Sequence, residues 1–170
     1  MTFQKTVRLS SGLGVPGEIL LHGPKRAGAY VVNSGDQSNT VGRAFTFNPD
    51  GNSVKVGGTG VFAGILANPK VYPLRGNIIA DNLQQMQLVD GTVGEFVTMG
   101  IMLATVDKSA KVGDYIAYDN TTGALTVVAN PGAGKTPSAP SGKTLVPNCQ
   151  VDRFPQTNST GGLVVIRLTN

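Results

Sequence analysis

The sequence has 170 residues, of which 40% are hydrophobic and 14% are charged. A chain of this length fits one domain that buries roughly 70% of its unfolded surface, and its hydrophobic content excludes global disorder. The formal net charge is +4 and no basic run is longer than Lys25-Arg26, so the basic patch of a nucleic-acid-binding protein is missing. The low charge and the 23 glycines favour strands and turns over helices.

Targeting signals and cofactor-binding clusters are not found in the sequence. Residues 1–13 lack the apolar core of a signal peptide, and no apolar run approaches the ~20 residues that span a bilayer. Cys149 is the only cysteine and His22 the only histidine, which excludes an intrachain disulfide and clusters of thiolates or imidazoles. We expect a protein that is made in the cytoplasm and soluble there, with no membrane partner and no metal or other cofactor.

The N-terminal segment, residues 1–18, begins with alternating apolar and polar side chains. Phe3, Val7 and Leu9 share one side of this alternation. Glycine and proline between residues 12 and 17 then exclude a helix. The segment is therefore either an edge strand of its own domain or an extended arm that adds a strand to a neighbouring sheet.

Short apolar runs separated by turn residues follow, which is the pattern of short strands. These runs cover residues 19–21, 29–32, 41–47, 54–56 and 61–66. Residues 71–87 are less regular, because Ile79, Leu83 and Met86 have helical spacing while residues 84–89 lead directly into a turn dipeptide. We expect at most one helical turn there, followed by a strand.

Residues 92–128 have the most regular strand pattern, and we expect them to form the core sheet. Asp90-Gly91, just upstream, suits a two-residue hairpin. Gly100 interrupts the first run and predicts a bulge or a sharp bend. The side chains predicted to face the core from this run are Val93, Val97 and Met99.

The C-terminal part changes in composition. Residues 129–147 include four prolines and predict a long exposed loop. Leu163–Leu168 is almost wholly apolar and predicts a central strand covered on both faces. The many short strands predict a single all-β domain over residues 19–170, a jelly-roll-like sandwich or barrel with little or no helix, preceded by the arm at residues 1–18.

Residues 129–136 end in Gly-Lys-Thr, as a phosphate-binding P-loop does. The motif needs glycine where Ala129 stands, and a helix must begin near the lysine. Pro137 and Pro140 prevent that helix. We interpret the segment as a linker and not as a nucleotide site.

The remaining candidates for catalysis are isolated. His22 is flanked by turn residues, and Cys149 has no neighbouring helix or histidine in the sequence to activate it. The acidic residues at predicted turns are interpreted as caps of backbone amides; they are Asp90, Asp107, Asp114 and Asp119. A carboxylate pair or a calcium site is left open by the residues alone, although no loop has the D-x-D-x-D-G grouping. We predict no catalytic residues and no enzyme.

The order of several fragments resembles that of a known family. The start M-T-F-Q-K-T-V, followed by G-V-P-G-E, is similar to the opening of the structural cement (head decoration) proteins of tailed bacteriophages. Later fragments resemble the same family in the same order: T-V-G-R-A-F-T-F, G-V-F-A-G-I-L, D-G-T-V-G-E-F-V-T-M-G and V-G-D-Y-I-A-Y-D-N-T-T-G-A-L. Together they cover most of residues 1–128.

The resemblance implies a structural role on the virion. Such a protein binds the exterior of a phage head, stabilises contacts between major capsid protein subunits, and acts as a homodimer or homotrimer without touching nucleic acid. In this interpretation the arm binds the capsid, and its candidate anchors are Phe3, Val7 and Leu9.

Three other functions compete with this interpretation. Another virion β-protein, such as a tail-tube or baseplate component, has the same composition. A carbohydrate-binding sandwich is disfavoured because Trp is absent and the four Tyr are dispersed. A hydrolase would have to use His22 or a carboxylate pair.

Overall fold

The computed structural model describes residues 14–20, 23–35, 39–68, 75–76, 86–155 and 157–169. These ranges contain no helix, and so none that could cross a membrane. The predicted all-β, single-domain fold is confirmed. The strands are β1 (Ile19–Leu20), β2 (Arg26–Val32), β3 (Asn39–Thr40), β4 (Ala44–Phe47), β5 (Ser53–Val56), β6 (Phe62–Leu66), β7 (Arg75–Gly76), β8 (Met86–Leu88), β9 (Val93–Val106), β10 (Tyr115–Asp119), β11 (Leu125–Val128), β12 (Lys143–Arg153) and β13 (Gly162–Leu168).

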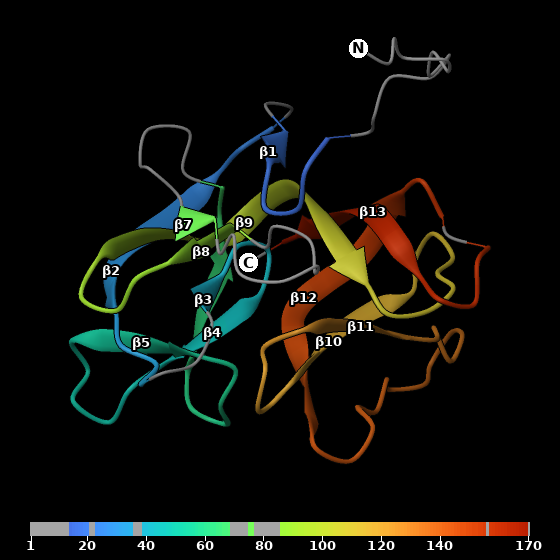
Figure 1. The fold of residues 1–170 in the computed structure, drawn as a ribbon. Coiled ribbons are helices and arrows are strands. Elements are labelled where there is room, and N and C mark those ends of the chain that lie inside the picture. Colours follow the sequence, from blue (N-terminus) through green and yellow to red (C-terminus); the bar gives the residue numbers. More distant parts are fainter. Residues whose placement is uncertain are drawn as a thin grey trace, which may run out of the picture.

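The first half of the fold is a small closed barrel. β9 pairs with β2 on one side and with β6 on the other, and the ring is completed by β5 and β4. The β2–β5 ladder is parallel, and the other ladders of the ring are antiparallel. Closure leaves these strands without an open edge, which makes the barrel a rigid unit. Figure 1 shows β2, β5 and β4 together on one side of the molecule.

The second half is an antiparallel sheet that shares β9 with the barrel. Its order is β11-β10-β12-β13-β9, and β1 pairs with the other edge of β9. Figure 1 shows β10 to β13 on the opposite side from β2 and β5, with β9 between the two groups. The predicted central strand is confirmed, because β13 lies between β12 and β9 and its Val164, Val165 and Ile166 are fully buried.

Gly100 marks the point at which β9 passes from the barrel to the sheet. The ladder with β2 ends at Met99 after a shift of register near Val97, and the ladder with β13 begins at Gly100. Gly100 has φ +139°, a backbone conformation that other residues rarely adopt. The predicted interruption at Gly100 is therefore confirmed.

Two apolar cores lie on either side of the shared strands. One core fills the barrel and includes Phe45, Leu66 and Phe96, with the Phe45 and Phe96 ring centroids 5.1 Å apart. The other lies between the barrel and the sheet and includes Ile65 and Val97. Alternate residues of β6 and β9 thus face different cores, so both faces of these strands are buried.

This double burial explains why the predicted core face of β9 is partly wrong. Val97 is buried as predicted, but Val93 is 47% exposed, and Phe96 on the opposite face is fully buried. The prediction assumed one solvent face and one core face. A strand that separates two cores has apolar residues on both faces, so period two alone does not identify its exposed positions.

The predicted hairpin at Asp90-Gly91 is also wrong. β8 pairs with β3 and β7 in a separate small sheet, whereas β9 belongs to the barrel. The Asp90 carboxylate instead accepts hydrogen bonds from the backbone of Ser34 and Gly35, at 3.0 and 2.9 Å, and from Asn39 Nδ2 at 2.7 Å. These bonds tie the turn to the segment after β2.

The exposed loop predicted at residues 129–147 is shorter in the structure, because β12 already begins at Lys143. Lys143 and Thr144 pair with the end of β10. Pro147 falls where the β10–β12 ladder shifts register, a position that requires no main-chain donor. The loop therefore covers residues 129–142, and no helix follows its Gly-Lys-Thr sequence.

Candidate binding surfaces

The predicted arm anchors Phe3, Val7 and Leu9 lie outside the described residues, as does His22. The Gly/Pro segment that follows the anchors is described. Glu18 N donates to Val15 O at 3.2 Å, with Pro16 and Gly17 between them and Gly17 at φ +79°. This is the arrangement of a type II turn.

The turn is fixed to both halves of the fold. Gly17 N donates to Leu103 O of β9, and Asn68 N, just after β6, donates to Gly17 O, both at 2.8 Å. A β-carbon at Gly17 would overlap the Val41 side chain and approach Leu66 O at 3.0 Å. Residues 14–18 are thus packed against the fold, and an arm can be proposed only for residues 1–13.

Most of the acidic residues predicted as turn caps have that role. Asp114 accepts backbone hydrogen bonds from Lys111 and Asn130 at 2.8 and 2.9 Å. Asp119 accepts from Thr121 and Thr122 at 2.9 and 2.8 Å, and the Thr122 bond is the main cause that lowers the pKa of Asp119. Asp107 differs, because its carboxylate forms an exposed ion pair.

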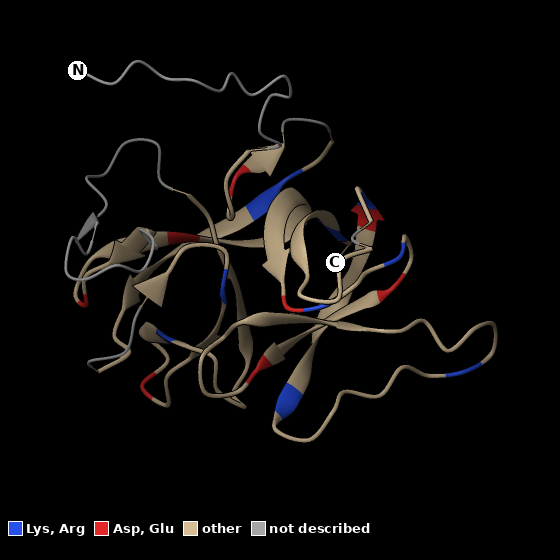
Figure 2. Ribbon diagram, turned by 45° about the vertical axis from the view of Figure 1, so that its right-hand side comes forward, with Lys and Arg blue, Asp and Glu red and all other residues tan. Residues whose placement is uncertain are grey.

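The ion pair of Asp107 with Lys143 spans 3.4 Å. Basic and acidic residues are interspersed along the ribbon, as Figure 2 shows. Other pairs join Lys25 to Glu95 at 3.2 Å and Arg153 to Asp152 at 3.0 Å. Charge is therefore spread over the described surface instead of forming a field of one sign.

Potential reactive groups are held in structural positions. Cys149 is completely buried in the core between barrel and sheet, and this burial raises the pKa of its thiol, which keeps it protonated and inert. Within the described ranges no three His, Cys, Asp or Glu side chains are close enough to hold a metal ion. The residues that the structure brings together are suited to packing and binding.

Two exposed valines lie side by side on the surface of the barrel. Val31 of β2 lies directly opposite Val93 of β9, and the side chains are 39% and 47% exposed. Opposed side chains in an antiparallel ladder have β-carbons about 4.5–5.5 Å apart, so the two valines form one continuous apolar spot. Sequence reasoning missed this valine pair because it assigned Val93 to the core; the charged Glu95, two positions along on the same face of the strand, was the signal that could have found it.

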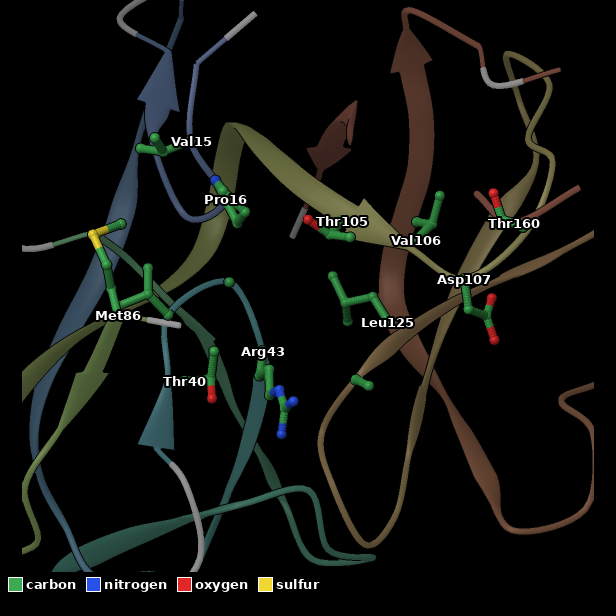
Figure 3. A pocket seen from close by; sticks show the side chains of 13 residues that line it. Val15, Pro16, Thr40, Arg43, Met86, Thr105, Val106, Asp107, Leu125 and Thr160 are labelled. Atoms are coloured by element: carbon green, nitrogen blue, oxygen red, sulfur yellow. The ribbon is translucent and has the colours of Figure 1, made fainter. Parts of the chain in front are cut away.

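A groove of about 580 Å³ runs between the barrel and the sheet. Figure 3 shows its labelled side chains, which come from the turn at Pro16, from β3 and the segment after it, from β8, from β9 and β11, and from two loops. Its apolar lining includes Val15, Pro16, Val41, Met86, Val106 and Leu125. No pattern in the sequence indicates this groove, because its walls come from segments far apart in the chain.

The barrel, the sheet and these two apolar surfaces define a rigid, structural β-protein with surfaces suited to binding other macromolecules. Residues 3–169 match the family described as Structural cement protein (E217 gp24/Pam3 gp6), and the chain belongs to this family. It is accordingly a structural protein of bacteriophage capsids, as the resemblance implied. No match is found among curated proteins.

A solved structure supports the fold. A chain of "The capsid of Myoviridae Phage XM1" superposes with a TM-score of 0.66 over 100% of this chain and 99% of that chain. The sequences are 20% identical, so this similarity speaks for the fold alone. Together with the family match, it shows that the barrel and sheet occur as one unit in another chain.

Proposed function

We propose that the protein binds the outer surface of a bacteriophage head and stabilises contacts between major capsid protein subunits. Membership of the cement family supports a place on the capsid, and the chain with the similar fold comes from the capsid of a phage. The protein is then located on the virion exterior, acts as a homodimer or homotrimer, and does not contact nucleic acid. It acts by binding and has no catalytic role.

The valine pair is the observation that carries this proposal. Val31 and Val93 are displayed on a closed barrel whose strands are fixed before binding, so little conformational entropy is lost when a partner covers them. A partner that covers the two valines removes their apolar surface from water, which favours binding. A stable interface buries roughly 800 Å² on each partner, so the valine pair is the centre of a larger contact.

The arm is the second proposed contact. Phe3, Val7 and Leu9 alternate ahead of a fixed turn, which allows an extended segment to present one apolar face to its partner. Deletion of residues 1–13, which leaves the packed turn intact, should lower retention of the protein on heads. Unchanged occupancy by a folded deletion variant would remove the arm from the proposal.

The test of the valine pair is a titration of heads stripped of the protein. The double variant Val31→Thr, Val93→Thr keeps β-branched side chains but makes the spot polar, and we expect its affinity to fall about tenfold, or about 1.4 kcal/mol. Val61→Thr is the matched control, because Val61 is 74% exposed and stands just before β6, outside the β2–β9 ladder that holds the valine pair. Equal affinities for the double variant, the control and the unmodified protein would refute the proposal.

A further inference from the structure

The groove has an open main-chain edge on β9. Leu103 N donates to Glu18 O at 2.9 Å, and Leu103 O accepts from Gly17 N at 2.8 Å, so the main-chain groups of Leu103 face β1. Main-chain groups alternate in direction along a strand, and the ladder of β9 with β13 is regular from Gly100 to Val106. Thr105 therefore directs its N–H and C=O to the same side as Leu103.

β1 does not extend far enough to cover Thr105. The chain turns at Pro16 and Gly17, immediately before the residues that bond to Leu103. Within the described ranges, no hydrogen bond to the main-chain N–H or C=O of Thr105 is found on this side. Thr105 also lines the groove and is exposed. Its main-chain N–H and C=O are therefore available to pair with an added strand in an apolar groove.

The neighbouring part of the groove wall is also an edge. β11 ends the sheet order and pairs only with β10 among the described strands, and its Leu125 lines the groove beside Thr105 and Val106. Unpaired strand edges attract an added strand, and burial of alternate side chains then sets the specificity of that addition. The groove thus fits an extended segment with one apolar face.

We propose that this groove receives the N-terminal arm, residues 1–9, of a second copy of the chain, which pairs with β9 at Thr105. Residues 1–9 have the required alternation, with Phe3, Val7 and Leu9 on one face. The inference names a neighbouring copy as the receptor of the arm, so that deletion of the arm would lower retention on heads through loss of the link between copies. It does not depend on binding to the head.

The turn indicates why the arm comes from another copy. It reverses the chain between Val15 and Glu18, so Gly14 and Val15 run back from the end of β1 and not onward along β9. A chain's own arm would need a second reversal to reach its own Thr105. Because Val15 lines the groove, a twofold axis that passes beside the groove would bring the origin of each arm near the groove of the other copy. With residues 1–9 docked, residues 10–13 must connect Leu9 to Gly14, a span of at most about 18 Å, so the inference requires two copies that lie side by side.

A disulfide test on the full chain distinguishes exchange from self-docking. One copy carries Val7→Cys or, for the other face of the arm, Thr6→Cys; a second copy carries Thr105→Cys. The native Cys149 is buried and does not compete. After mixing and mild oxidation, peptide mapping should find the linkage between the arm cysteine and the cysteine of Thr105→Cys in different copies. The yield should be several times that obtained with Val61→Cys, an exposed position just before β6.

Two outcomes overturn the inference. Equal yields with Thr105→Cys and Val61→Cys would show that the cross-link reports random collision. A chain carrying both Val7→Cys and Thr105→Cys that links only within itself, even when mixed with single variants, would show that the arm occupies its own groove. Head binding is measured on the same variants, so loss of capsid retention with an intact cross-link would separate this inference from the proposed function.

Discussion

Val31 and Val93 face each other across the β2–β9 ladder and are both left exposed, although each strand is otherwise anchored in a closed barrel. An apolar cross-strand pair in water adds little to folding, because much of its surface stays hydrated. The same pair contributes more when a partner covers it and removes that surface from water. Stability and binding should therefore respond differently to changes at these positions.

We predict that Val31→Thr with Val93→Thr lowers the free energy of unfolding by no more than about 1 kcal/mol, within the range of cross-strand effects. Phe96→Ala, on the same strand but fully buried in the barrel, should cost about 3–5 kcal/mol. Urea unfolding followed by circular dichroism measures both. If the valine variant is as destabilised as the Phe96 variant, the pair belongs to the packing of the barrel and not to a binding surface.

Gly123 joins the sheet to the barrel, and we predict that Gly123→Ala is far more harmful than Gly132→Ala. Both glycines have positive φ, +67° and +91°, so both substitutions carry a strain of about 1–2 kcal/mol. Only at Gly123 would the new β-carbon collide, at 2.5 Å from Ala44 O and 3.0 Å from Gly57 N. Gly132 has open space around it.

The additional loss at Gly123 should be at least about 2 kcal/mol, as expected for overpacking. The two variants are compared by thermal unfolding under the same conditions. Similar melting temperatures for Gly123→Ala and Gly132→Ala would mean that the turn moves freely away from Ala44, and that the hydrogen bond from Ala44 N to Gly123 O at 2.9 Å does not fix the joint.

Asp90 is predicted to be the most important acidic cap of the barrel. Its carboxylate accepts from Ser34 N, Gly35 N and Asn39 Nδ2. Asp90→Asn places an amide donor against these donors, and we expect a loss of about 1–3 kcal/mol. Asp107→Asn, which removes only an exposed ion pair at 3.4 Å, should change stability by less than about 1 kcal/mol. Chemical denaturation midpoints of the two variants give the comparison, and a reversed order would contradict it.

The burial of Cys149 leads us to predict that the protein becomes less stable at alkaline pH. Burial raises the pKa of the folded thiol, whereas the unfolded thiol titrates near ~8.5. The contribution of Cys149 is therefore complete below about pH 8.5 and is lost as the pH rises above that value, by about 1.4 kcal/mol per unit. Between pH 8.5 and 10 the free energy of unfolding of the unmodified protein should fall by about 2 kcal/mol more than that of the Cys149→Ala variant. If the free energy of unfolding changes with pH in the same way for both proteins, the Cys149 thiol is accessible to water in the folded state.

Much of the fold follows from local sequence. Short β-branched runs between glycine, asparagine and proline predict the strands because each turn residue ends one run and the alternation fits a pleated sheet. Leu163–Leu168 is predicted as a central strand, and β13 has that position. The cement family is also apparent from the order of short fragments, and the family match over residues 3–169 confirms it.

The pairing of the strands does not follow from local sequence. Asp90-Gly91 has the composition of a hairpin turn, yet hydrogen bonds to Ser34 and Gly35, more than fifty positions earlier, determine its role. Val93 has a strand alternation that is equally consistent with a buried or an exposed side chain. Only closure of the barrel, with β9 between β2 and β6, determines which face receives a second core.

The all-β class, the turn-forming acids and the family likeness can all be read from the chain alone, because those properties depend on residues close together in sequence. The positions of the binding surfaces cannot. The pairing of Val31 with Val93, and the groove that Thr105 lines, are formed by segments that are distant in sequence. Such contacts arise from burial of two cores around one shared strand, which no single segment specifies.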